Sequence, residues 1–189
     1  MSPMLANAAS SPRAAIATGL AALVLMTSAG LGHAQSGFDE DFDDDTKPWQ
    51  EIAIQLPPPP LAENLLPFEV SATATQSFAI DAKSLTVGAD GVVRYTLVTT
   101  SPAGAKNVSY EGIRCASFEK KLYAFGHPDG SWSRSRRDQW ERIVRNAANR
   151  QHATLALDYF CDNLTVAGNA DQMLSRIRRQ RSLRDVPGQ

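Results

Sequence analysis

The stretch that decides the fold is Tyr110-Glu111-Gly112-Ile113-Arg114-Cys115, which continues into Lys120-Lys121-Leu122-Tyr123-Ala124-Phe125-Gly126. These two apolar-rich runs predict two consecutive β-strands. Cys115 closes the first run, and the other cysteine of the chain, Cys161, closes a later apolar run, Leu155-Ala156-Leu157-Asp158-Tyr159-Phe160. The sequence therefore predicts a central strand that is tied to a later segment through two sulfur atoms.

Short turns join further predicted strands to this pair. Asp90-Gly91 is a strong hairpin signal between residues 84–87 and 92–99. In the second of these arms Val93, Tyr95 and Leu97 share one face, because side chains alternate along a strand. Strands joined by short turns form a meander, and the strands of a meander are antiparallel.

One irregularity is expected inside the central strand. Val108 and Tyr110 occupy even positions, whereas Ile113 and Cys115 occupy odd ones, and Gly112 lies between the two pairs. The change of phase predicts a β-bulge at Gly112.

The C-terminal part is predicted to be helical. Met173, Leu174 and Ile177 form one apolar stripe within residues 171–184. Residues 151–160 fit either a helix or a strand, because the period of so short a run does not decide between them. The fold class is therefore α+β, an antiparallel meander of four to six strands with one or two C-terminal helices.

Residues 1–34 have the features of a secretory signal peptide. Arg13 supplies the positive charge, residues 14–27 are apolar, and Gly32-His33-Ala34 places small residues around a cleavage site. The alternative is an uncleaved membrane anchor, but the apolar run is short for a span, which needs about 20 residues. The mature chain is therefore expected in the periplasm or at the cell surface, without a transmembrane span.

The mature chain is predicted to have three parts. Residues 35–64 form an acidic and proline-rich flexible arm, because such a composition buries little apolar surface. Pro57 to Pro60 make the end of this arm a stiff extended connector. Residues 65–184 form the single α+β domain, and residues 185–189 form a tail.

A disulfide between Cys115 and Cys161 follows from the expected location. The chain has two cysteines, both lie after the cleavage site, and the destination is oxidising. Two buried free thiols are the first alternative. A redox-active pair is the second, and such pairs are usually close in sequence.

The motifs of common enzymes are missing from the sequence. After cleavage the remaining histidines are His127 and His152, which are far apart, so neither a metal site nor a cofactor is predicted. No nucleophile elbow, phosphate loop or dinucleotide fingerprint occurs, and no catalytic residue is predicted. A binding or structural protein without enzymatic activity is the leading interpretation. The alternative is a small periplasmic hydrolase whose site is assembled from scattered residues.

An anionic partner is the binding hypothesis. Residues 35–110 carry an excess of acidic residues and residues 111–189 an excess of basic ones, which indicates internal compensation or a surface that faces a polyanion. The candidate binding residues are Trp132, Arg134, Arg136, Arg137 and Trp140, since arginine binds carboxylate or phosphate and tryptophan offers a flat apolar face. An envelope polyanion or a protein partner fits them, and nucleic acid does not fit an exported protein. The alternative is two core-capping tryptophans beside a solvated basic face.

Several blocks of the sequence resemble a known family. They are Phe38-Asp39-Glu40-Asp41-Phe42, Lys47-Pro48-Trp49, Asn64-Leu65-Leu66-Pro67-Phe68, Gly91-Val92-Val93-Arg94-Tyr95, Asn107-Val108-Ser109-Tyr110-Glu111-Gly112-Ile113-Arg114-Cys115 and Asp158-Tyr159-Phe160-Cys161. In this order they resemble the cryptic neisserial protein-like family of exported bacterial proteins, over roughly residues 38–180. That family has no established activity, so the resemblance implies no catalytic residues. The layout is more loosely similar to small bacterial surface-adhesin domains.

Overall fold

The computed structural model describes residues 48–146 and 149–185. The chain divides into two units, Met1–Asp45 and Thr46–Gln189, and all described residues fall in the second. The predicted signal peptide, the acidic part of the predicted arm and all but the first residue of the predicted tail lie outside the described residues.

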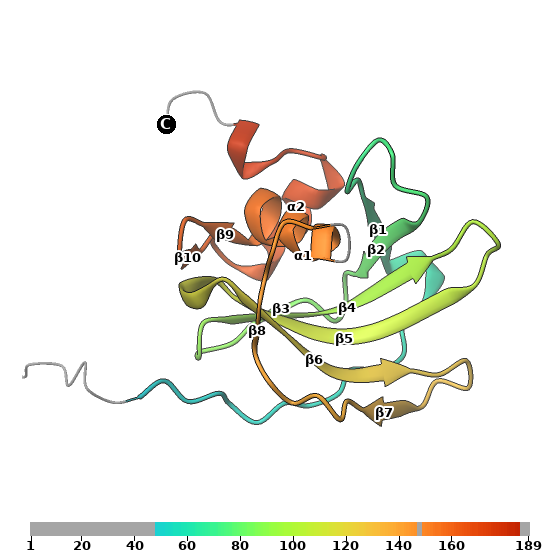
Figure 1. The fold of residues 1–189 in the computed structure, drawn as a ribbon, viewed down its shortest axis with the longest axis horizontal. Helices are drawn as coiled ribbons and strands as arrows, with labels where there is room; N and C mark the ends of the chain where they lie inside the picture. Colours follow the sequence, from blue (N-terminus) through green and yellow to red (C-terminus); the bar gives the residue numbers. More distant parts are fainter. Residues whose placement is uncertain (1–47, 147–148, 186–189) are drawn as a thin grey trace, which may run out of the picture. The chain divides into compact units, whose positions relative to one another are not determined.

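An antiparallel sheet forms the centre of the second unit (Figure 1). Its main strands, hydrogen-bonded in chain order, are β1 (Leu65–Phe68), β2 (Ser77–Asp81), β4 (Val92–Thr100), β5 (Lys106–Arg114), β6 (Glu119–Gly126) and β7 (Trp132–Arg134). Two short strands pair at the sides, β3 (Thr86–Val87) with β4 and β8 (Glu141–Arg142) with β6. The predicted meander and the α+β class are confirmed, and the two short strands bring this sheet to eight strands.

Helices and a small hairpin cover one face of the sheet (Figure 1). They are α1 (Arg150–Thr154), the π-helical η4 (Leu155–Phe160), the hairpin of β9 (Cys161–Asp162) and β10 (Thr165–Val166), and α2 (Ala170–Arg178). Single 3₁₀ turns occur at η1 (Ala62–Asn64), η2 (Cys115–Ser117) and η5 (Leu183–Asp185). Residues 151–160, which fitted helix or strand equally well, are therefore helical.

Helix α2 begins and ends for identifiable reasons. Asn169 and Gln172 form a reciprocal capping box at its start, with two bonds of 3.0 Å. Met173, Leu174 and Ile177 are buried, which confirms the predicted stripe. The helix ends earlier than predicted, because Gln180 adopts a left-handed conformation (φ 49°) that reverses the chain.

The main core lies between the sheet and the helices. Val93, Tyr95 and Leu97 all point into it, as the alternation of β4 predicts. The Tyr95 ring packs on Phe160 with 5.4 Å between ring centroids, and neither side chain is exposed to solvent. The predicted disulfide is confirmed and joins Cys115 in η2 to Cys161 at the start of β9. It therefore links the sheet to the helical layer.

An extended segment, residues 48–61, crosses the opposite face of the sheet, and we call it the strap (Figure 1). Ile54 and Leu56 of the strap pack on a second apolar cluster that contains Tyr110 and Tyr123. The structure differs here from the predicted flexible arm and from a domain that begins at residue 65. The reason is that alternate apolar strap residues find partners on a sheet face that the sequence analysis left uncovered.

The strap also explains the changed phase of the central strand. The side chains of β5 alternate between the two faces of the sheet without interruption, with Ile113 in the main core and Tyr110 in the second cluster. Apolar residues occur at both even and odd positions because both faces are covered. The predicted bulge at Gly112 is therefore wrong. The register instead shifts between Tyr110 and Glu111, which pair with Ala124 and Leu122, so the extra residue is Tyr123 on β6.

Candidate anion-binding site

Arg176 is a partly buried cation with no acidic partner in residues 48–146 and 149–185. Its Nε donates to the carbonyl oxygen of Tyr159 at 3.2 Å, and its Nη2 donates to that of Ala167. Tyr159 belongs to η4, and π-helical turns are frequent at functional sites. Burial lowers the pKa of Arg176, because the charge loses water and the described chain supplies no carboxylate in return.

Arg176 also lines a cavity of about 310 Å³. The segment after α2 forms its wall, and this segment is held by a bond of 3.0 Å from Ser182 Oγ to Asp158 Oδ1. Arg179 and Arg181 line the same cavity and are exposed. Three arginines and one acidic residue, Asp185, therefore line this cavity. The Asp185 carboxylate accepts a bond from the Ser182 backbone at 3.0 Å. The charge around the cavity favours an anion.

A second cavity, of about 290 Å³, has the same character. Arg145, Arg150 and Arg184 line it together with Asp158. The carboxylate of Asp158 is already bound by Arg184 Nε at 2.8 Å, so Arg145 and Arg150 have no ion pair among the described residues. Five arginines line these two cavities and have no ion pair among the described residues, and we call them the basic helical face. They are Arg145, Arg150, Arg176, Arg179 and Arg181. Guanidinium groups of this kind bind phosphate or carboxylate through two parallel hydrogen bonds.

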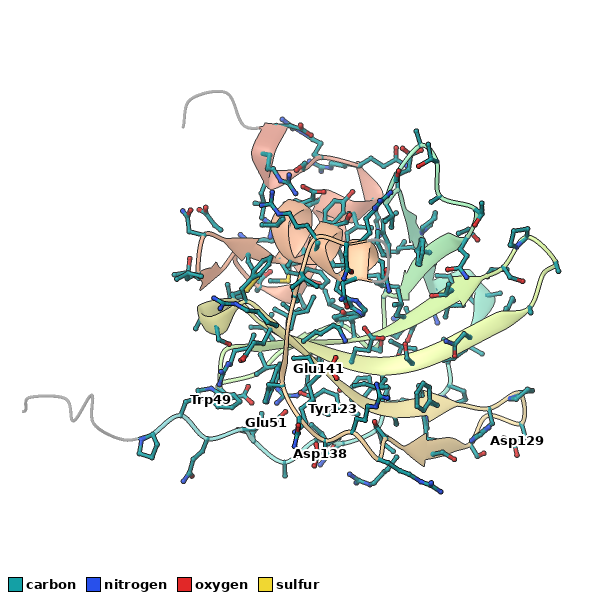
Figure 2. All side chains as sticks on the ribbon, viewed as in Figure 1. Trp49, Glu51, Tyr123, Asp129, Asp138 and Glu141 are labelled. Atoms are coloured by element: carbon teal, nitrogen blue, oxygen red, sulfur yellow. A yellow bond between two sulfur atoms is a disulfide. The ribbon has the colours of Figure 1, made fainter. Side chains whose placement is uncertain are left out.

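The charges that hold the strap are, by contrast, paired with one another. Glu51 accepts bonds from Tyr123 Oη at 2.5 Å and from Lys121 Nζ at 2.8 Å. Lys121 also contacts Asp138 at 2.6 Å, and Figure 2 shows Glu51, Tyr123 and Asp138 close together. Burial would raise the pKa of Glu51, but the hydrogen bonds from Lys121 and Tyr123 lower it below its usual value. This network fastens the strap.

Arg94 completes the fastening from beneath the strap. Its guanidinium binds both carboxylate oxygens of Asp90, at 3.0 and 2.6 Å, and approaches Glu51 at 3.4 Å. Burial would lower the pKa of Arg94, but Asp90 and the neighbouring Tyr123 raise it, so the side chain stays charged. The Asp90 turn also holds the strap directly, through Trp49 Nε1 to the Asp90 carbonyl at 2.8 Å and Ile52 N to its carboxylate at 3.1 Å.

A buried polar cluster around Glu111 is the nearest approach to a catalytic constellation. Its carboxylate accepts bonds from Ser109 at 2.7 Å and Tyr95 at 3.2 Å, and His152 Nε2 lies at 2.8 Å. A nucleophilic serine needs a bond to the base itself, whereas Ser109 donates to the carboxylate. The large cavities described above and on the strap side are not lined by these residues. The cluster is therefore suited to joining β4, β5 and α1.

The residues predicted to bind an anion are placed in several environments. Trp132 donates from Nε1 to the Pro57 carbonyl at 2.9 Å, and Trp140 packs edge-on against Trp49 at 5.8 Å between centroids. Each tryptophan thus has its own partners in the strap. Arg134, Arg136 and Arg137 are exposed, and Arg134 lines a cavity of about 300 Å³ with Glu51 and Asp138.

The arginine stacked on the tryptophans is one that the sequence analysis did not select. The Arg114 guanidinium lies 4.1 Å from the centroid of Trp49 and 5.5 Å from that of Trp140. It is also paired with Glu119 at 2.7 Å, so its charge is compensated. The sequence analysis also missed Arg176, Arg179 and Arg181. The signal for these was the run of arginines at the end of α2, with few acidic neighbours.

Two further properties hold for residues 48–146 and 149–185. No helix in these ranges has the length and apolar character needed to cross a membrane. Within the same ranges no three histidine, cysteine, aspartate or glutamate residues gather as a metal site would require.

Comparison with known proteins gives a family match. The model of the CNP1-like family matches residues 44–178, which include the strap, the whole sheet and α2. No curated protein and no solved structure matches the chain. The match does not show that this family is the one of the cryptic neisserial proteins, and that resemblance stays a prediction. Because the match covers well over half of the sequence, the chain belongs to the CNP1-like family.

Proposed function

We propose that this protein is an exported, envelope-associated binding module without enzymatic activity, whose basic helical face holds phosphate groups of an envelope polyanion. The observation that supports the proposal most directly is the environment of Arg176. Arg176 is partly buried and lines a cavity of about 310 Å³, and within the described ranges its guanidinium bonds to backbone carbonyls and to no carboxylate. A charge withdrawn from water without a counter-charge is costly, and an anion in the cavity would offset that cost.

Two further observations support the proposal. Arg179 and Arg181 line the same cavity, so a bound phosphate would meet several donors at once. The Cys115–Cys161 disulfide suits an oxidising compartment, as expected after export through residues 1–34. The Ser182 hydroxyl at this cavity donates to Asp158, and the Asp185 carboxylate accepts from the Ser182 backbone. The two are therefore not arranged as a nucleophile and its base, which suits binding rather than hydrolysis.

Binding of the mature chain, residues 35–189, to two phosphate-bearing probes tests the proposal. The probes are phosphatidylglycerol vesicles, with phosphatidylcholine vesicles as the uncharged control, and soluble polyphosphate. We expect binding to the anionic probes that weakens as salt is raised. A preference for vesicles indicates a lipid source of the phosphate, and a preference for polyphosphate indicates a polymer.

Matched double variants locate the site. Arg179→Ala with Arg181→Ala should weaken binding roughly tenfold or more, since each arginine near an anionic surface contributes about 1 kcal/mol. Arg136→Ala with Arg137→Ala removes the same charge from the region selected by sequence and should have little effect. A loss confined to the second variant would return the site to residues 132–140, and no binding by the wild type would refute the proposal.

A further inference from the structure

A separate cavity of about 290 Å³ lies at the end of the sheet where β5, β6 and β7 meet the strap. The turn that carries Asp129, labelled in Figure 2, leads into β7 at this end of the sheet. Pro59 and Pro60 of the strap form one wall, and Val108 and Trp132 form another. The walls are thus largely hydrocarbon and aromatic ring, as in small-molecule sites.

The pairing of the strands places the apolar wall of this cavity. Val108, Gly126 and Trp132 stand side by side on three neighbouring strands. A Cβ at Gly126 would lie 2.8 Å from Val108 Cγ1 and 3.3 Å from Trp132 Cζ3. The bare glycine therefore lets the valine and the indole approach each other.

The polar atoms of the walls are mostly occupied. The Trp132 indole N–H donates to Pro57, and the Ser131 hydroxyl donates to Asp129 at 2.7 Å. His127 Nε2 is 2.6 Å from Ser133 Oγ. Lys106 also lines the cavity, is exposed, and has no ion pair in the described part of the chain. Its ammonium group is the open charge at this site, and no carboxylate is among the lining residues.

Volume and charge together define the ligand. An apolar cavity of about 150 Å³ holds benzene. A cavity of about 290 Å³ therefore has room for one ring and a short chain. The geometry points to a binding site for a small monocarboxylate, with its apolar body between Trp132 and the two prolines and its carboxylate at Lys106. This site is independent of the basic helical face and of the function proposed for it.

Calorimetric titration of the mature chain with 3-phenylpropionate tests the inference, and 3-phenylpropanamide is the matched uncharged ligand. We expect the acid to bind more tightly than the amide. Lys106→Ala should weaken binding of the acid about fivefold, as for a partly exposed charge pair, and leave the amide unchanged. Lys106→Arg should retain binding of the acid.

Two controls separate this site from others. Lys83→Ala removes an equal charge elsewhere, and Arg179→Ala with Arg181→Ala disables the proposed polyanion site; neither should change binding of 3-phenylpropionate. The inference is overturned if neither ligand binds, if acid and amide bind equally, or if Lys106→Ala binds the acid as well as the wild type.

Discussion

Single residues on the two faces of the sheet show how this small domain accommodates buried charge. Glu111 and Arg94 are 7% and 4% exposed, on the helical face and the strap face respectively. Each is paired, Glu111 with donors from three elements and Arg94 with Asp90 and Glu51. Removing one partner from such a pair costs more than the pair contributes, because it leaves a buried charge uncompensated.

Glu111 should govern the stability of the protein toward acid. Burial would raise its pKa, but His152, Ser109 and Lys120 lower it below the unfolded value of about 4.3. Its contribution to the free energy of unfolding is therefore complete above about pH 4.3 and is lost as the pH falls through the folded pKa. Glu111→Gln should cost about 1–3 kcal/mol at pH 7 and progressively less below pH 4, measured by urea unfolding. A cost that does not change with pH would contradict this assignment.

Gly112 is required by the close approach of Tyr123. A Cβ at this position would lie 2.6 Å from Tyr123 Oη and 3.0 Å from Val92 Cγ1. Gly112→Ala should therefore destabilise the protein by about 1–3 kcal/mol and loosen Glu51, which the tyrosine hydroxyl holds. Denaturant unfolding measures the loss. In a double-mutant cycle with Tyr123→Phe, the double variant should lose less stability than the sum of the losses in the two single variants. Simple additivity would show that the hydroxyl is not the obstacle.

At the scale of elements, the strap distinguishes this domain from a simple meander packed on helices. It covers the sheet face that carries Arg94 and Tyr110, with an apolar cluster at one end and paired charges at the other. Trp49, labelled in Figure 2, marks the end where the indole reaches the Asp90 turn. The strap thus does for one face of the sheet what the helices do for the other.

Removal of the strap should therefore destabilise the domain. A chain that begins at Thr46 keeps every described contact, whereas one that begins at Ala62 uncovers the second apolar cluster and leaves Arg94 and Lys121 without Glu51. We expect a loss of at least about 3–5 kcal/mol on going from the first to the second, measured by thermal and denaturant unfolding. The stability of the Glu51→Gln variant should lie between the stabilities of the two truncated chains. Equal melting temperatures for the two truncated chains would mean that the strap does not support the fold.

The comparison of elements also shows what local sequence can and cannot predict. The Asp90-Gly91 hairpin, the Met173 stripe and the Cys115–Cys161 pair were predictable, because turn chemistry, helical period and the count of cysteines are local or unambiguous. The strap was not, because an extended segment rich in proline has no period and its bonds join distant residues. Glu51 and Tyr123, for example, are 72 positions apart. Arg176 was missed for the same reason, since its missing counter-charge is visible only after folding.

At the scale of the whole molecule, cations are unevenly compensated. Each cation of the network that fastens the strap is matched by a carboxylate, as Arg94 is by Asp90. Arginines of the helical layer, among them Arg145, Arg150 and Arg176, lack such partners in the described chain. The cations that hold the strap are therefore compensated, whereas the five arginines of the basic helical face are not paired with any carboxylate of the described residues.

The last prediction links the location of the protein to its stability. The Cys115–Cys161 bond spans 46 positions and joins the sheet to the helical layer, which otherwise meet through apolar contacts and the Glu111 cluster. Closing a loop of this length in the unfolded chain contributes about 4 kcal/mol in the chain-entropy model. The total stability of such a domain is about 5–15 kcal/mol.

Residues 35–189, produced without the predicted signal peptide in a reducing cytoplasm, should therefore unfold at markedly lower urea concentration than the exported protein. Oxidation of the purified chain should restore its stability. The Cys115→Ala, Cys161→Ala variant should have the same low stability toward urea whichever compartment it is produced in. This control distinguishes the effect of the disulfide from other effects of export. Thiol labelling of the exported, denatured protein should find no free thiol, and two labelled cysteines per chain would refute both the bond and the oxidising compartment from which it was predicted.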